Sequence, residues 1–249
     1  MRTARTGAVL TVTLDRADQL NAQTPATWAA LRAVGDGLPD DVRVVVLRGA
    51  GRSFSAGLDR DLLDPDPAVP GGLGELGRMP PEAAAERIRG YQGAFRWLRS
   101  PGIVSVAAVQ GHAIGAGAQL ALACDLRVLA DDAQLRLPEA TLGLVPDLTG
   151  TSTLTELVGY SRAMEICLTG RAVKAAEAQA IGLANLVVPA ADLDAAVADL
   201  VGALTGPPVE ASRATAALVR SAVRNDPAAQ DAAERAAQVQ RLQELVGGR

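Results

Sequence analysis

Two glycine-rich stretches point to a site at which backbone amides bind an oxygen. Residues 111–125, GHAIGAGAQLALACD, hold three glycines within seven residues, between an apolar run and an apolar helical pattern. We expect a tight turn from Gly111 to Gly115 and a helix from about Ala116, whose first N–H groups have no partner within the helix. The helix dipole favours an oxygen with developing negative charge as their partner. Close packing of the helix against a sheet explains the glycines equally well.

A second stretch of the same kind strengthens the chemical interpretation. In residues 51–63, GRSFSAGLDRDLL, the pair Ala56-Gly57 again follows a predicted strand and precedes a polar helix start. Two such bends can each give one peptide N–H to a single oxygen. That arrangement is an oxyanion hole, which stabilises the negative charge that develops on a carbonyl oxygen during a reaction.

Other glycine-based sites fit residues 111–125 less well. A dinucleotide-binding turn needs G-x-G-x-x-G, but Gly115 and Gly117 are followed by Leu120 where the third glycine would stand. No Gly-Lys-Ser/Thr follows, which excludes a nucleoside-triphosphate-binding loop. The sequence contains no G-x-S-x-G elbow and His112 is its only histidine, so a Ser-His-Asp triad has little support.

Strands that alternate with helices must position these bends. Thr24-Pro25 predicts a helix start, because threonine caps helices and proline suits their first position. Residues 64–81 are rich in Pro and Gly and predict a mobile surface loop, followed by a helix from about Glu82 to Arg99. Short apolar runs rich in β-branched residues predict strands in a mostly parallel sheet of an α/β fold, at residues 8–14, 42–47, 103–109, 126–129 and 186–188.

The C-terminal part of the chain shows only helical patterns from about Ala190. We therefore divide the sequence into a core, residues 1–189, and a C-terminal helical region, residues 190–249, that would pack between subunits. The 249 residues, 49% of them hydrophobic, suffice for one large core.

Composition restricts the partners. The formal net charge of −4 argues against nucleic acid or an anionic membrane, so a small molecule is the expected ligand. No apolar run is long enough to cross a bilayer and the first residues do not resemble a signal peptide, which predicts a cytoplasmic protein. Cys124 and Cys167 lack the paired spacing of a metal site or a disulfide framework, so they are expected to be core thiols and no metal is expected.

Four motifs along nearly the whole chain resemble the crotonase superfamily, the enoyl-CoA hydratases and isomerases. They are LDRADQLNAQ (14–23), SFSAGLDRDLL (53–63), VQGHAIGAGAQLALACDLRV (109–128) and the stretch from LPEATLGLVPD (137–147) to ANLVVP (184–189). The resemblance implies an α/β fold, the crotonase/ClpP-like spiral of ββα units, with a C-terminal helical trimerisation region. It also implies a homotrimer or a dimer of trimers, and an acyl-CoA substrate. Coenzyme A would then enter as part of the substrate, with no permanently bound cofactor.

The same resemblance assigns roles to residues. The amides of Leu58 and Ala116 would bind the thioester oxygen, although position 116 is normally Gly in this family. Glu139 matches a catalytic glutamate, Gln119 stands where hydratases have their second glutamate, and Asp147 matches the second acid of dienoyl-CoA isomerases. Coenzyme A would contact residues around the two bends, with Arg16 or Arg60 near a phosphate: Gln19, Leu20, Ala56, Leu58, Asp59, Arg60, Asp61 and Gly115.

This residue set favours isomerisation over hydration. Hydratases of the family use two glutamates on one water molecule, and a glutamine cannot accept a proton. The Δ3,Δ2-enoyl-CoA isomerases instead move a proton between two carbons with one base at the position of Glu139. Three alternatives stay open: Gln119 holds the water of a hydratase, the protein binds acyl-CoA without turning it over, or Asp147 and Glu139 serve only at helix starts. The sequence ends at QRLQELVGGR, without the family's usual last segment, which puts some contacts with coenzyme A in doubt.

Overall fold

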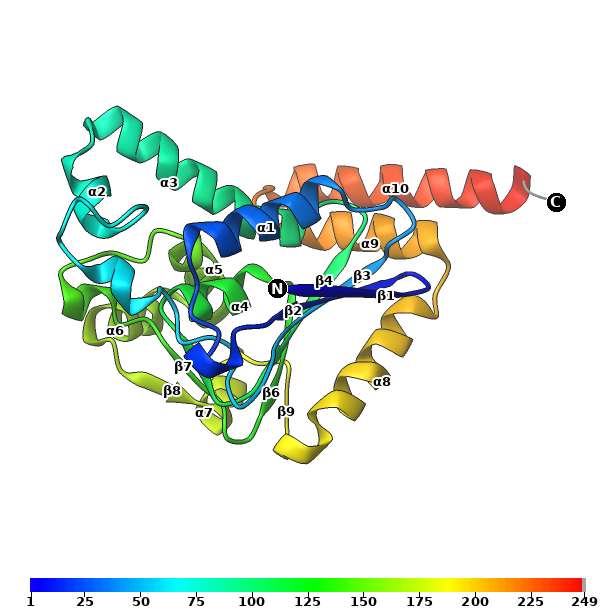
Figure 1. Cartoon of the computed structure of the whole chain (residues 1–249). Helices are drawn as coiled ribbons and strands as arrows, with labels where there is room; N and C mark the ends of the chain where they lie inside the picture. The colour runs from blue at the N-terminus through cyan, green and yellow to red at the C-terminus, as the bar shows by residue number, and fades with distance from the viewer. Residues whose placement is uncertain (248–249) are drawn as a thin grey trace.

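The computed structural model describes residues 1–247 and contains a sheet of six strands in the order β1-β2-β3-β4-β6-β9. β1 pairs with β2 antiparallel, and every other neighbouring pair in this sheet is parallel, as the sequence predicts. A second sheet has the order β5-β7-β8. The strands, drawn in Figure 1, are β1 (Arg2–Thr6), β2 (Val9–Leu14), β3 (Val44–Gly49), β4 (Val104–Val109), β5 (His112–Ile114), β6 (Leu126–Ala130), β7 (Gln134–Arg136), β8 (Ala172–Lys174) and β9 (Leu186–Val188).

Helices connect the strands and make up the C-terminal part. The α-helices are α1 (Pro25–Asp36), α2 (Leu73–Arg78), α3 (Pro81–Arg96), α4 (Ala116–Ala123), α5 (Gly150–Val158), α6 (Tyr160–Thr169), α7 (Ala175–Ala180), α8 (Leu193–Thr205), α9 (Val209–Ala222) and α10 (Pro227–Gly247). Short 3-10 turns are η1 (Ala17–Gln19), η2 (Arg60–Leu63), η3 (Trp97–Arg99), η4 (Glu139–Leu142) and η5 (Ala190–Asp192). Among residues 1–247, no helix combines the length and the apolar character needed to span a bilayer.

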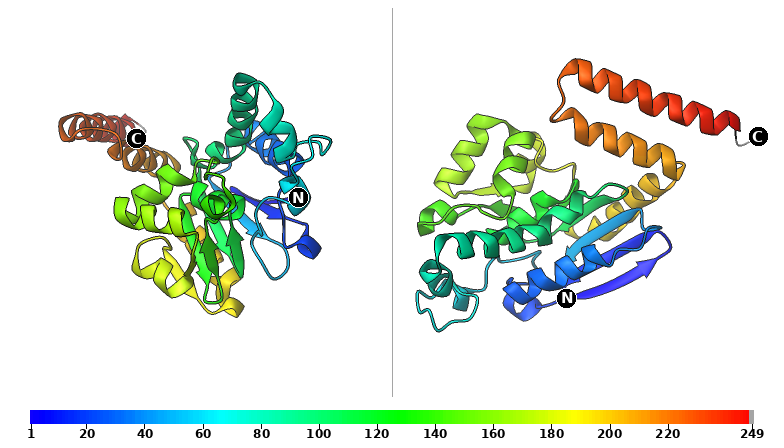
Figure 2. Two further views of the ribbon diagram at one scale, coloured as in Figure 1. Left: turned by 90° about the vertical axis from the view of Figure 1, so that its left-hand side faces the viewer. Right: turned by 90° about the horizontal axis from the view of Figure 1, so that it is seen from above.

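Helices cover both faces of the large sheet (Figure 2). On one face α1 and α3 lie side by side, where the ring of Trp28 packs on Tyr91 at 4.6 Å between centroids and on Phe95 at 6.3 Å. On the other face Leu193 and Val197 of α8 pack against a layer of valines from β3, β4 and β6. The sheet is therefore buried on both sides, which explains why its central strands are nearly continuous apolar runs.

Several local predictions are confirmed, and two are wrong. Thr24 caps α1 by accepting a hydrogen bond from the Thr27 amide at 3.3 Å, with Pro25 as the first helical residue.

The predicted turn from Gly111 to Gly115 instead contains strand β5, which pairs with β7. Residues 64–81 are not wholly irregular, because they include α2, where Glu75 accepts a hydrogen bond from Arg87 of α3 at 3.0 Å. Of the two predicted core thiols, Cys124 is buried and Cys167 is only partly so.

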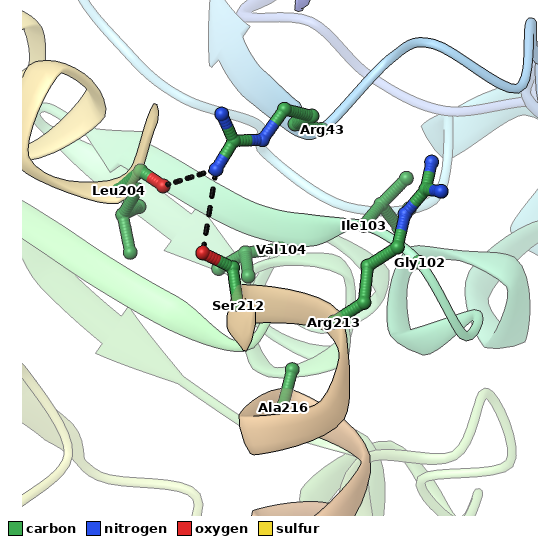
Figure 3. A pocket seen from close by; sticks show the side chains of 8 residues that line it. All are labelled: Arg43, Gly102, Ile103, Val104, Leu204, Ser212, Arg213 and Ala216. Atoms are coloured by element: carbon green, nitrogen blue, oxygen red, sulfur yellow. Dashed lines mark hydrogen bonds between the residues drawn. The ribbon is translucent and has the colours of Figure 1, made fainter. Parts of the chain in front are cut away.

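The C-terminal helices are attached to the core by arginines that bind main-chain carbonyls. Arg43, next to β3, donates to the carbonyl oxygen of Thr205, the last residue of α8, at 2.6 Å, and to that of Pro207, in the turn between α8 and α9, at 2.8 Å. A small pocket beside Arg43 is lined by none of the residues predicted to do chemistry (Figure 3). Arg220 of α9 pairs with Asp125 at 2.9 Å. The division at residue 189 stays a prediction.

Candidate active site

The first bend is the one at Ala56-Gly57, within residues 51–63, and backbone pairing with Gln23 shapes it. The Gln23 amide donates to the Gly57 carbonyl at 2.7 Å, and the Asp59 amide donates to the Gln23 carbonyl at 2.9 Å. Because Gln23 bonds to the residues on either side of Leu58, the Leu58 N–H points away from it. Within residues 1–247 that N–H has no hydrogen-bond acceptor. The first predicted oxyanion donor is therefore available to a ligand.

Buried polar side chains beneath this bend hold it in place. The hydroxyl of Ser55 donates to the Asn21 carbonyl at 2.8 Å and accepts from the Gly57 amide at 3.2 Å. The Gln23 side chain donates to the Ser55 hydroxyl at 3.1 Å and accepts from the indole N–H of Trp28 at 2.8 Å. Sequence reasoning missed this network, since its members are far apart along the chain and only the fold brings them together.

The second bend is the one at Gly115, within residues 111–125, and it leads from β5 into α4. Gly115, with φ of 51°, precedes the helix, and its amide donates to the Arg136 carbonyl of β7 at 2.8 Å. Ala116 is the first residue of α4 and is 6% exposed. Among the hydrogen bonds of the described chain, its amide is not a donor, as expected for the first turn of a helix.

The two bends lie against each other, and Glu139 lies beside the second. A β-carbon built at Gly57 would stand 2.4 Å from the Ile114 carbonyl oxygen and 3.5 Å from the Ala116 nitrogen. A β-carbon at Gly115 would stand 3.5 Å from Oε1 of Glu139. The fold thus gathers the segments that carry Leu58, Ala116 and Glu139, which are far apart in sequence.

Glu139 is a buried carboxyl group with one oxygen hydrogen-bonded and the other without a hydrogen-bond partner in the described chain. It starts η4, is 9% exposed, and its Oε1 accepts a hydrogen bond from Nε2 of Gln119 at 2.8 Å. Its Oε2 is buried and accepts no hydrogen bond within residues 1–247. Burial raises the pKa of this carboxyl, the nearby charge of Asp147 raises it further, and the Gln119 donor opposes the rise. A raised pKa and an oxygen without a hydrogen-bond donor suit a group that takes up and releases a proton.

We expect Glu139→Gln to be more stable than the parent protein at alkaline pH and nearly equal to it at acid pH. Because burial raises the folded-state pKa of Glu139, its protonated form stabilises the fold. That contribution is complete below the unfolded-state pKa and is lost as pH rises through the folded-state pKa. Urea unfolding at about pH 4 and about pH 8 measures the difference. A stability difference that is the same at both pH values would contradict this expectation.

The side chain of Gln119 is fully engaged as an acceptor. Its Oε1 accepts hydrogen bonds from the amides of Leu148 at 2.8 Å and Gly150 at 3.2 Å, while its Nε2 donates to Glu139. A side-chain carbonyl oxygen has two lone pairs, and here both are used. Gln119 therefore has no acceptor left with which to orient a water molecule.

Asp147 lies close enough to Glu139 for its charge to raise the pKa of that carboxyl. Burial also raises the pKa of Asp147 itself. Its main-chain oxygen accepts a hydrogen bond from Nε2 of Gln92 in α3 at 2.7 Å, a contact that the sequence did not suggest. The alternative that Asp147 caps a helix is wrong, because α5 starts at Gly150 with Thr149 as its cap residue.

The residues predicted to contact coenzyme A lie near the first bend, except Gly115 at the second. The guanidinium of Arg16 is already bound within the protein, since it pairs with Asp59 at 2.9 Å and donates to the Ala22 carbonyl at 2.8 Å. Arg60 is exposed at the start of η2, as is Asp61. The Leu20 carbonyl accepts from the Ala56 amide at 2.8 Å, which ties the first motif to the second, and Gln19 bonds to Arg16. Of the two candidate phosphate ligands, Arg60 is the one whose side chain makes no hydrogen bond or ion pair within residues 1–247.

Comparison with known proteins gives consistent matches. A protein from Thermobifida fusca, a candidate enoyl-CoA hydratase crystallised with CoA, has 49% sequence identity and a TM-score of 0.91, covering 99% of this chain and 94% of that one. An enoyl-CoA hydratase from Polaromonas has 29% identity and a TM-score of 0.87, over 99% of this chain and 93% of that one.

Two curated relatives match over shorter stretches. The Mycobacterium tuberculosis protein "Probable enoyl-CoA hydratase echA8" is 33% identical over 73% of this chain, a match that spans 66% of its own length. A glyoxysomal fatty acid beta-oxidation multifunctional protein from Cucumis sativus is 38% identical over 62% of this chain, but only 20% of its own length is matched. The family model described as Enoyl-CoA hydratase/isomerase matches residues 4–245. This chain is a member of the enoyl-CoA hydratase/isomerase family.

Proposed function

We propose that this protein shifts the double bond of an enoyl-CoA by moving a proton between two carbons of the acyl chain. The observation that carries the proposal is the state of Glu139: a buried carboxyl whose Oε1 accepts from Gln119 and whose Oε2 has no hydrogen-bond partner within residues 1–247. A single-base proton shuttle requires one carboxylate with an oxygen that no hydrogen-bond donor occupies. The CoA complexes of the Thermobifida fusca protein support a coenzyme A thioester as the substrate.

In the proposed reaction Glu139 removes a proton from C2 of a 3-enoyl-CoA. The electron pair of that C–H bond forms a C2–C3 double bond, the former C3–C4 double bond supplies the electrons for a new bond at C4, and Glu139 returns the proton to C4. Between the two transfers the thioester oxygen carries negative charge, which the amides of Leu58 and Ala116 stabilise. No atom is gained or lost overall. Asp147, whose pKa burial also raises, would serve as a second acid for longer proton transfers.

Hydration is the competing function, because many relatives are named enoyl-CoA hydratase. A hydratase must hold and deprotonate water. In this chain the position of the second glutamate is Gln119, and both acceptor lone pairs of that amide are used by Leu148 and Gly150. This geometry supports isomerisation as the main activity.

Separate incubations with a 3-enoyl-CoA and a 2-enoyl-CoA decide between these functions. Mass spectrometry detects water addition as a gain in mass, and chromatography separates the double-bond isomers. We expect the 3-enoyl-CoA to isomerise without a change in mass. Conversion of only the 2-enoyl-CoA, with addition of water, would refute isomerisation. Tight binding of acyl-CoA by calorimetry, with no product from either compound, would favour a binding protein without activity.

The remaining predictions about partners rest on the same family membership. We propose that coenzyme A enters only as part of the substrate, with no permanently bound cofactor, and that Arg60 contacts one of its phosphates. We also propose that residues 190–249 pack between subunits of a homotrimer or a dimer of trimers. Sedimentation equilibrium of the full chain measures the oligomeric state, and a monomer at all concentrations would contradict the last of these proposals. The cytoplasmic location also stays a prediction.

A further inference from the structure

We propose that Gln119 is a positioning residue that joins the Glu139 carboxyl and residues 147–150 into one hydrogen-bonded unit. Its amide would fix Oε2 of Glu139 as the oxygen that exchanges protons with the acyl chain. The inference deepens the proposed function and rests on it for the chemistry at Oε2. The placement of Glu139, by contrast, can be tested without any substrate.

The hydrogen bonds of Gln119 reach in two directions from one buried side chain. Gln119 is 1% exposed, in the middle of α4. Nε2 donates to Oε1 of Glu139, while Oε1 accepts from the amides of Leu148 and Gly150. A β-carbon at Gly150 would stand 2.7 Å from Cγ of Gln119, so the segment also packs tightly on its methylene groups. This amide has little freedom to rotate or to leave.

The segment that Gln119 holds is the one that carries Asp147. Two amide side chains from different helices hold this segment: Gln92 of α3 donates to the Asp147 carbonyl, and Gln119 of α4 accepts from the residues that follow it. Thr149 lies between the two residues whose amides bond to Gln119. Its φ is 72°, in the left-handed region that residues other than glycine rarely adopt. The contacts from both helices therefore maintain a backbone that is strained on its own.

Occupation of Oε1 has a chemical consequence. A hydrogen bond donated to one carboxylate oxygen stabilises the charged form and leaves the other oxygen as the place for a proton. Since Oε2 of Glu139 has no donor in the described chain, the proton resides on Oε2 whenever the group is protonated. Gln119 thus determines which oxygen of Glu139 exchanges the proton. It also opposes the rise in the pKa of Glu139 that burial causes.

Two substitutions separate the two halves of this role. Gln119→Leu removes the donor to Glu139 and the acceptor for Leu148 and Gly150. Gln119→Glu keeps an acceptor for those two amides but places a second carboxylate against Glu139. In both variants the carboxylate form of Glu139 is less favoured, so its titration midpoint should move to higher pH. Only Gln119→Leu should speed hydrogen exchange at the amides of Leu148 and Gly150.

The measurements are carbon-13 NMR titration of the Glu139 carboxyl, assigned with Glu139→Gln, amide hydrogen exchange, and the pH profile of kcat for a 3-enoyl-CoA. We expect kcat of Gln119→Leu to fall by about 10²-fold, the loss typical of a small misplacement of a reacting group. The acid limb of its pH profile should move in the same direction as the NMR midpoint. A merely structural role would lower kcat at every pH and leave the midpoint where it is.

Gln110→Leu is the matched control. Nε2 of Gln110 also makes two hydrogen bonds to backbone, to the carbonyls of Gly49 at 2.8 Å and Gly51 at 3.0 Å, but it does not touch Glu139. Its loss should lower stability without moving the Glu139 midpoint. An unchanged NMR midpoint in both Gln119 variants would overturn the positioning role. A shifted midpoint in a protein that does not isomerise 3-enoyl-CoA would support the positioning of Glu139 and refute only the proposed reaction.

Discussion

Glu139→Gln should abolish turnover of an enoyl-CoA while leaving its binding nearly unchanged. The amide has the shape of the carboxyl and can still accept from Gln119, so the site should keep its geometry. It cannot take up a proton, however, and loss of a general acid–base group costs about 10²–10⁴-fold in rate. Stopped assays give kcat, and calorimetry with a saturated acyl-CoA, which cannot react, gives the binding constant.

The matched control is Glu86→Gln, which removes a carboxylate from an exposed site on α3, where Glu86 pairs with Arg89. Its kcat should equal that of the parent protein. Glu139→Gln with full activity would remove Glu139 from the mechanism. Equal loss of binding and of turnover in Glu139→Gln would instead indicate that the substitution damages the site as a whole.

Gly57→Ala should remove most activity by forcing the two bends apart. The added methyl group would stand 2.4 Å from the Ile114 carbonyl oxygen, far inside van der Waals contact, and Gly57 has φ of 90°. The backbone must shift where the segment of Leu58 meets the start of α4, so the two proposed amide donors would move relative to each other. Loss of one such donor lowers the rate by about 10²–10³-fold. The effect should appear mainly in kcat for a 3-enoyl-CoA.

Gly7→Ala separates backbone strain from this clash. Gly7 also has positive φ, 56°, in the turn between β1 and β2, but an added β-carbon there meets no atom within 4 Å. Both variants should be less stable to urea, since alanine disfavours positive φ. Only Gly57→Ala should lose activity. Parallel losses of activity in the two variants would argue against a close junction between the bends.

The bends and Glu139 were predictable, whereas the contacts that orient Glu139 were not. Glycines at strand ends and a Thr-Pro helix start carry local signals, so residues 51–63, 111–125 and Thr24 could be interpreted from sequence. The hydrogen bonds that Gln119 accepts from the amides of Leu148 and Gly150 join residues that only the tertiary structure brings together. The geometry of these hydrogen bonds depends on how α4 and α5 pack, and the residue types alone do not predict that packing.

Short strands escaped prediction for a different reason. β5, β7 and β8 have three residues each, too few to show an alternating pattern, and each includes a polar residue, whereas the equally short β9 is a wholly apolar run. β1, with the sequence RTART, is exposed throughout and lies at the sheet edge, where no apolar face is needed. The Gly111–Gly115 turn was therefore predicted without the strand inside it.

The burial of α4 limits how this protein could acquire a different chemistry. All eight residues of the helix are buried, and five of them are Ala or Gly. Enlarging any of these small side chains would displace tightly packed neighbours, at a typical loss of 1–3 kcal/mol, about a fifth of the stability of many domains. New substrate preferences would thus arise in the exposed residues of 140–145 and in residues 64–68, which are exposed, while the helix that presents Ala116 and Gln119 stays constant.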